Sequence, residues 1–278
     1  MRLAVCAEMV FTDLPFTERV RRLHEAGFDV ELWDSSTKDI GALKATGAVF
    51  SSMTGYTAGS LVDPDSADEV VRTAEALIPT AMELGVSRMV VHPAQLIDGH
   101  AARPVYRSSG HMWITGARTL QRLGRLGEKY GVTFCLENLN TILDHPGIPL
   151  ARARDTLALV TAAGHPRVKL MLDLYHAQMG EGNLIELVRA ALPHIGEIQV
   201  ADVPGRCEPG TGEINYAAIA RALVRAGYDG TVGMEAWASG DSYAALAAFR
   251  TAFSVPAMTE AATPGLHPAS GPHTGAKA

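Results

Sequence analysis

Residues 115–138 read "TGARTLQRLGRLGEKYGVTFCLEN", and they contain the unit that decides the fold. The first part is amphipathic with a helical period and closes at Gly131, a residue favoured where a helix ends in the left-handed conformation. The run "VTFCLEN" (132–138) is short, apolar and β-rich, which is typical of a buried strand. The stretch therefore predicts a helix, a glycine stop and a strand that ends near a carboxylate, Glu137.

The same alternation recurs along most of the chain. Strands are expected at residues 3–7, 29–33, 48–53, 88–93, 132–138, 168–174, 197–201 and 231–237. Amphipathic stretches predict helices at residues 16–27, 66–85, 115–131, 153–164, 183–192, 215–227 and 242–253. Eight strands in such an alternation predict an α/β fold, a (β/α)₈ TIM barrel, which often forms a single domain of about 250 residues.

Two further patterns set the limits of this prediction. A doubly wound parallel sheet is the main alternative, but "CAEMVFTDLP" (6–15), after the first strand, has no glycine for a nucleotide-binding turn. We therefore expect one TIM-barrel domain over residues 1–253. Residues 254–278 are rich in Pro, Gly, Ala, Thr and His and have no apolar period, so they predict a disordered, flexible C-terminal tail.

The composition excludes several functional classes. The 278 residues are 47% hydrophobic and 19% charged, as in a globular protein. The net charge is −6 and the Lys and Arg residues are scattered, so we expect no binding of nucleic acid or of an anionic membrane. Three cysteines without a CxxC pair, and an N-terminal apolar stretch too short for a membrane span, favour a cytoplasmic protein.

Chemistry in such barrels lies at the C-terminal ends of the strands. Burying several carboxylates there costs many kcal/mol unless a cation compensates their charge. Any one of these groups alone fits a helix cap or an ion pair equally well, but four at equivalent strand ends favour a metal site. Their hard oxygen donors favour Mg²⁺ or Mn²⁺ over zinc, with Co²⁺ or Ni²⁺ as substitutes. The four residues are Glu137, Asp173, Gln199 and Glu235.

Nearby polar residues leave alternatives open. His176, three residues after Asp173, fits either an ordinary loop histidine or a substrate contact. The planar fork of Arg206 suits a substrate carboxylate or hydroxyl, or else an ion pair with Glu208 or Asp202. Three aromatic residues could wall the pocket or pack in the core: Trp33, Tyr56 and Trp113.

Three segments resemble a known family. They are "LMLDLYHAQMGEGNL" (170–184), "IGEIQVADVPGRCEPGTGEINY" (195–216) and "GYDGTVGMEAW" (227–237), and they are similar to the hydroxypyruvate isomerase branch of the xylose isomerase-like TIM-barrel (sugar isomerase/epimerase) superfamily. The resemblance covers residues 1–253. Its most specific part is the strand with Gln199 and the loop after it, because ketose 3-epimerases usually have histidine at that position.

The resemblance implies roles for single residues. The family's metal ligands fall on the same four positions as the strand-end argument, and its acid/base pair falls on Glu137 and Glu235. Its substrate contacts fall on His176 and Arg206, and we expect His92 and Glu208 to join them. One departure is "LENLNTILDHPG" (136–147), where many hydroxypyruvate isomerases read closer to "EPINTRDMPG", so this loop is one residue longer and lacks an arginine.

The resemblance implies a metal-dependent isomerase that acts on a small hydroxy-keto acid through an enediolate. The named reaction is conversion of hydroxypyruvate to 2-hydroxy-3-oxopropanoate (tartronate semialdehyde). Alternatives are a ketose 3-epimerase, an inosose or keto-polyol isomerase or dehydratase and, in another class, a non-catalytic sugar-binding barrel or subunit. Relatives often assemble, so a homo-oligomer stays an alternative to a monomer.

Overall fold

The computed structural model describes residues 1–255, and its centre is a closed barrel of eight parallel strands. Each strand pairs with its neighbour along the chain, and the first pairs with the last. The strands are β1 (Arg2–Cys6), β2 (Asp29–Leu32), β3 (Phe50–Thr54), β4 (Arg88–Val91), β7 (Thr133–Glu137), β8 (Val168–Asp173), β9 (Ile195–Val200) and β10 (Thr231–Met234). All eight lie within one or two residues of a predicted run or inside it, so the TIM barrel is confirmed.

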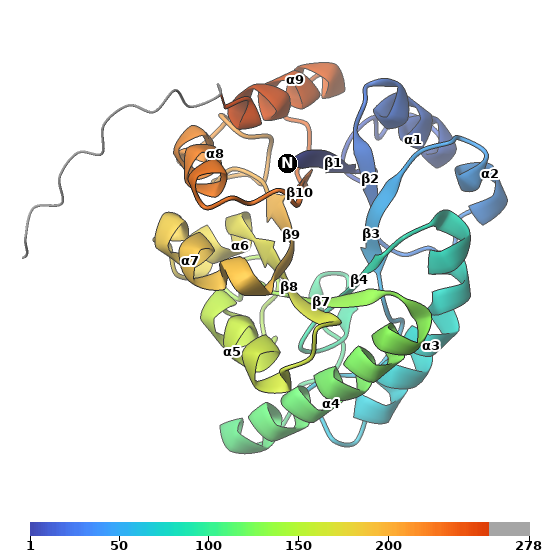
Figure 1. Ribbon diagram of the computed structural model, residues 1–278, viewed down its shortest axis with the longest axis vertical. Coiled ribbons are helices and arrows are strands. Elements are labelled where there is room, and N and C mark those ends of the chain that lie inside the picture. The colour runs from blue at the N-terminus through green and yellow to red at the C-terminus, as the bar shows by residue number, and fades with distance from the viewer. Residues whose placement is uncertain (256–278) are drawn as a thin grey trace, which may run out of the picture.

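Helices form a ring outside the strands (Figure 1). They are α1 (Phe16–Glu25), α2 (Ile40–Lys44), α3 (Ala67–Leu84), α4 (Ser109–Tyr130), α5 (Ala153–Ala163), α6 (Leu174–Gly180), α7 (Leu184–Ala191), η1 (Leu192–His194), α8 (Tyr216–Arg225) and α9 (Ser242–Phe253). Gly131 caps α4 in the left-handed conformation, so the predicted glycine stop is confirmed, and Gly85 and Gly164 end α3 and α5 in the same way. No helix within residues 1–255 is long and apolar enough to cross a membrane.

The structure adds elements that the sequence pattern does not predict. Helices α2 and α6 have five and seven residues, which is too short for an apolar period to be recognised. A hairpin of β5 (Leu96–Ile97) and β6 (His100–Ala101) interrupts the connection from β4 to α4, and α4 begins earlier than predicted, at Ser109. The predicted tail lies outside the described residues from 256 onward.

The strand register positions the polar residues of the barrel mouth. Asp173 of β8 pairs with Gln199 of β9, and Gln199 in turn pairs with Gly233 of β10. Glu137 is the last residue of β7, and Glu235 follows β10 directly. All four predicted ligands are therefore brought to one side of the same barrel end, where their side chains are buried.

Candidate active site

A cavity of about 1000 Å³ opens at the C-terminal ends of the strands. Its lining is mostly acidic where it is charged, since among the described residues that line it Arg206 is the only arginine or lysine. Trp33 and Tyr56 wall the cavity, whereas Trp113, on α4, packs against the core. The carboxylates in the lining are Glu31, Asp34, Asp98, Glu137, Asp144 and Glu235.

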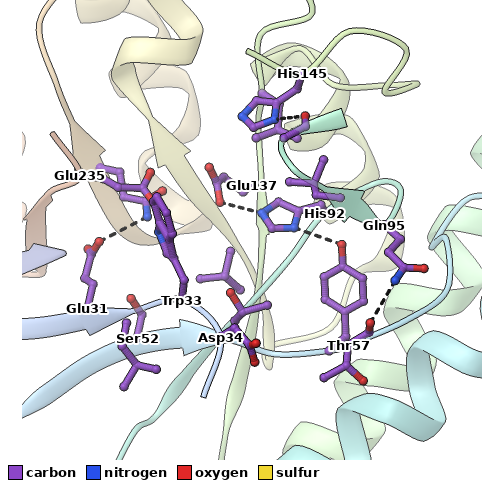
Figure 2. A pocket seen from close by; sticks show the side chains of 18 of the residues that line it. Glu31, Trp33, Asp34, Ser52, Thr57, His92, Gln95, Glu137, His145 and Glu235 are labelled. Carbon is purple, nitrogen blue, oxygen red and sulfur yellow. Dashed lines mark hydrogen bonds and ion pairs between the residues drawn. The ribbon is translucent and has the colours of Figure 1, made fainter. Parts of the chain in front are cut away.

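Glu137 and His92 form one end of the site. The ring of His92 points toward Glu137 (Figure 2), and His92 Nε2 lies 3.0 Å from Glu137 Oε2. The Nδ1 of His92 lies 3.1 Å from the hydroxyl of Tyr56. Burial raises the pKa of Glu137 well above its ordinary value, helped by the charge of Glu235, and burial lowers the pKa of His92 to about 4. Burial thus disfavours the charged forms of both side chains and weakens any ion pair between them.

Asp173 begins helix α6 and is held on several sides. Its Oδ1 accepts a hydrogen bond from the backbone N–H of His176 (3.0 Å). The side chain of Asn138 accepts from the Asp173 N–H (3.0 Å) and donates to its carbonyl (2.8 Å). Glu137, Asp173 and His176 each offer a ligand atom within 4.8 Å of the others, so this buried triad is close enough to hold a metal ion.

Gln199 presents a free acceptor to the same space. Its Nε2 donates to Glu31 Oε2 at 3.4 Å, while its Oε1 is buried and has no hydrogen-bond partner within residues 1–255. A buried carbonyl oxygen without a partner is costly unless something positive or protic reaches it. The donor set, with carboxylates beside an orphaned amide oxygen, therefore fits a hard divalent cation.

Glu235 and Arg206 form the opposite end of the site. Arg206 donates from Nη2 to Glu235 Oε2 (2.7 Å) and lies 3.7 Å from Asp173 Oδ2, and Trp33 Nε1 donates to Glu235 Oε1 (2.5 Å). Burial lowers the pKa of Arg206, but the carboxylates of Glu235 and Asp173 outweigh burial and raise it above its ordinary value. The guanidinium also packs over the ring of Tyr175. This arginine is therefore a fixed positive charge between two carboxylates.

The loop from β9 to α8 is organised by its own carboxylates. Asp202 accepts three backbone hydrogen bonds, from Val203, Ile214 (both 2.9 Å) and Gly210 (2.8 Å). Glu208 accepts from the N–H and hydroxyl of Ser239, at 2.9 and 2.6 Å. Among the described residues, neither carboxylate forms an ion pair with Arg206. They order the loop, while Arg206 pairs with Glu235 and Asp173 at the barrel mouth.

The predicted site residues occupy two layers. The cavity is lined by His92, Glu137, Gln199, Arg206 and Glu235. Asp173 and His176 lie behind this lining, fully buried, and Glu208 lies beside the mouth against Ser239. The sequence analysis did not select Glu31, Asn138, Asn140 or Gly233 as site residues. The one sequence signal for the two asparagines is that both lie within three residues of Glu137.

Comparison with known proteins agrees with this geometry. The family model described as "Xylose isomerase-like TIM barrel" matches residues 9–253. The chain belongs to this family. The resemblance read from the sequence is thereby confirmed.

Individual relatives agree with the family. The chain is 27% identical to a 2-oxo-tetronate isomerase of Pectobacterium atrosepticum over 84% of this chain and 91% of that protein. It is 34% identical to a hydroxypyruvate isomerase of Escherichia coli over 48% of this chain and 51% of that one. The crystal structure titled AP endonuclease, family 2, from Brucella melitensis superposes with a TM-score of 0.79, at 26% identity and over 90% of this chain and 98% of that one. With isomerases as its named sequence relatives, this member of the family is an isomerase.

Gly233 makes room for Glu31, and this can be tested. A Cβ atom at Gly233 would lie 1.7 Å from Glu31 Oε1 and 2.5 Å from its Cδ, so Gly233→Ala forces the carboxylate to move. We expect the free energy of unfolding in urea to fall by about 1–3 kcal/mol, as for other overpacked cores. Gly110→Ala is the control, since a Cβ there meets nothing within 4 Å. In a Glu31→Ala background the cost of Gly233→Ala should shrink; additive losses would contradict the steric explanation.

Proposed function

We propose that this isomerase is metal-dependent and moves a proton between neighbouring carbons of a small hydroxy-keto acid, with hydroxypyruvate and 2-hydroxy-3-oxopropanoate as its substrate and product. The observation that carries the proposal is the pair of buried glutamates, Glu137 and Glu235, which reach one cavity from β7 and β10 (Figure 2). Two carboxylates in different environments suit a reaction that removes a proton at one carbon and returns one at the next.

The proposed metal ligands are Glu137, Asp173, Gln199 and Glu235. The orphaned oxygen of Gln199 and the three buried carboxylates support this set, and their oxygen chemistry favours Mg²⁺ or Mn²⁺, with Co²⁺ as a substitute. A cation held there would supply the positive charge that stabilises an enediolate. Gln199 completes the set without adding negative charge, which favours retention of an anionic substrate.

The remaining roles follow from the contacts in the site. Glu137 and Glu235 are the proposed acid/base pair; the first is hydrogen-bonded to His92, and the second accepts hydrogen bonds from Trp33 and Arg206. Arg206 is the proposed partner of the substrate carboxylate, since it is the one permanent cation among the described residues of the lining. We also assign substrate contacts to His92 and His176, whereas the predicted contact of Glu208 is not supported, because both its carboxylate oxygens accept from Ser239 outside the lining of the cavity.

A second substrate class has support of its own. The cavity of about 1000 Å³ lies at the upper end of ordinary ligand pockets, of roughly 300–1000 Å³, and exceeds what a three-carbon acid needs. The Pectobacterium relative that is similar along 91% of its length is named as a 2-oxo-tetronate isomerase. We therefore propose four-carbon 2-oxo acids as the alternative substrates.

Proton transfer can be tested directly. With Mg²⁺ or Mn²⁺ in D₂O, the protein should exchange the C3 hydrogens of hydroxypyruvate, as followed by NMR. Glu137→Gln should lower this rate about 10²- to 10⁴-fold, the usual contribution of a general base. Asn215→Asp, at an exposed helix N-cap, is the control and should exchange normally. Catalysis at this site is disproved if neither Glu137→Gln nor Glu235→Gln slows exchange.

Metal binding should be visible without turnover. Mn²⁺ at one hundred times its Kd should stabilise the protein by about 2.7 kcal/mol, and EDTA should reverse the rise in Tm. Gln199→Ala should shift the Mn²⁺ titration to higher concentration while leaving the metal-free Tm close to that of the native chain. If Mn²⁺ does not change the Tm of the native chain, the metal site is refuted.

The products separate the reaction types. A panel of three- to six-carbon keto acids and ketoses should yield compounds in which the carbonyl has moved to the neighbouring carbon, as read by ¹³C NMR. An inverted carbon with an unmoved carbonyl would instead identify a 3-epimerase. Binding without any exchange or product would identify a non-catalytic barrel.

A further inference from the structure

We propose that Asn140 is a positioning residue that fixes the tautomer of His176, so that the Nε2–H of His176 donates a hydrogen bond into the site and does not bind the metal. The inference deepens the proposed function and rests on it for the identity of the accepting group. It adds a role for Asn140, which lies in the loop after β7. It also decides between two uses of the triad of Glu137, Asp173 and His176.

The amide of Asn140 can lie in only one orientation. Its Oδ1 accepts hydrogen bonds from the backbone N–H groups of Leu143 (3.0 Å) and Asp144 (3.1 Å). Only an oxygen can accept these bonds, so the NH₂ group must lie on the other side of the side chain. There it donates to Asp144 Oδ2 (2.6 Å) and approaches His176 Nδ1 at 2.8 Å. With two bonds accepted and two donated, Asn140 uses all its hydrogen-bonding capacity.

The orientation of Asn140 dictates the proton position on His176. An amide nitrogen has no acceptor, so the 2.8 Å contact is a hydrogen bond only if Nδ1 of His176 carries no proton. A neutral imidazole with a free Nδ1 has its proton on Nε2. The carboxylate of Asp144 lies 3.9 Å from Nδ1 and is already engaged by Asn140, so it does not draw the proton to that side.

The surroundings of Nε2 show what its proton faces. The His176 side chain is fully buried, and Nε2 has no hydrogen-bond partner within the described part of the chain. Asp173 Oδ2 lies 3.5 Å from Nε2 and Glu137 Oε1 lies 3.9 Å away, both too far for a good hydrogen bond. The ring of His145 packs edge-on against that of His176, with centroids 4.9 Å apart. An unsatisfied N–H therefore lies within 4 Å of both carboxylates.

In this arrangement Nε2 of His176 can act as a hydrogen-bond donor but not as a metal ligand. A metal ion needs the lone pair of Nε2, and that lone pair is absent while the nitrogen carries a proton. A substrate oxygen that enters beside Glu137 and Asp173 would instead accept the hydrogen bond. The bond strengthens as negative charge develops on that oxygen, which is the behaviour that stabilises an enediolate. Asn140 thus supplies the donor without touching the substrate.

¹⁵N NMR of the histidine-labelled full-length chain tests the tautomer. His176 is assigned among the ten histidines by the signals lost in His176→Gln. The native protein should show a protonated Nε2 and an unprotonated Nδ1 at neutral pH, and saturating Mg²⁺ should leave the Nε2–H signal in place. An Nδ1–H tautomer, or loss of the Nε2–H signal when Mg²⁺ binds, would overturn the proposal.

Asn140→Asp tests the positioning role. The substituted carboxylate accepts instead of donating, so the proton of His176 should move to Nδ1, and kcat should fall about 10- to 100-fold with KM changed far less. Asn215→Asp makes the same chemical change at an exposed cap and should alter neither tautomer nor kcat. An unchanged His176 tautomer in Asn140→Asp would refute the role of Asn140. Both NMR measurements of the tautomer require no turnover, so they can refute the role of Asn140 independently of whether the proposed reaction is correct.

Discussion

The crowding of buried carboxylates at the barrel mouth is the constraint on which the site depends. Glu137, Asp173 and Glu235 are almost completely removed from solvent, and the one permanent cation among the described lining residues is Arg206. Unpaired buried charges are strongly unfavourable, so each carboxylate needs a proton, a cation or several donors. The three carboxylates are stabilised in different ways. Glu137 is hydrogen-bonded to His92, and Glu235 accepts from Arg206 and Trp33. Asp173 accepts from the backbone at the start of α6 and lies 3.7 Å from Arg206.

Amide side chains hold the polar residues of the barrel mouth in place without adding charge. Asn138 forms hydrogen bonds with both the N–H and the carbonyl of Asp173, and Asn140 links its own loop to His176. Gln199 donates to Glu31 and presents its oxygen to the site. Each amide has a donor and an acceptor at fixed positions, so it can impose a direction on its neighbours. A carboxylate at the same place would raise the local negative charge, and a lysine would compete with a metal for the carboxylates.

The sequence predicts the barrel well because its strands are buried on both faces and read as apolar runs. The same runs predict which carboxylates meet, since the ends of parallel strands share one edge. Short helices such as α2 carry too little periodicity to be predicted. Hydrogen bonds across the barrel cannot be predicted from local patterns either, because the partners are far apart in sequence. Glu31 and Gln199 are 168 positions apart. Trp113 shows the same limit, because a helical aromatic residue can face either the pocket or the core until its neighbours are known.

The interior of the barrel below the mouth extends the same constraint. Glu197 is fully buried and pairs with Arg88 at 3.3 Å, while Glu31, farther toward the mouth, has its pKa raised by burial and by the charge of Glu197. Glu31 fits only because β10 has glycine at position 233. A neutral Glu31 would still accept the hydrogen bond from Gln199 without adding charge beside three carboxylates. The orientation of the proposed ligand Gln199 thus depends on an absent side chain in the neighbouring strand, which explains why the four strand-end residues alone do not define the site.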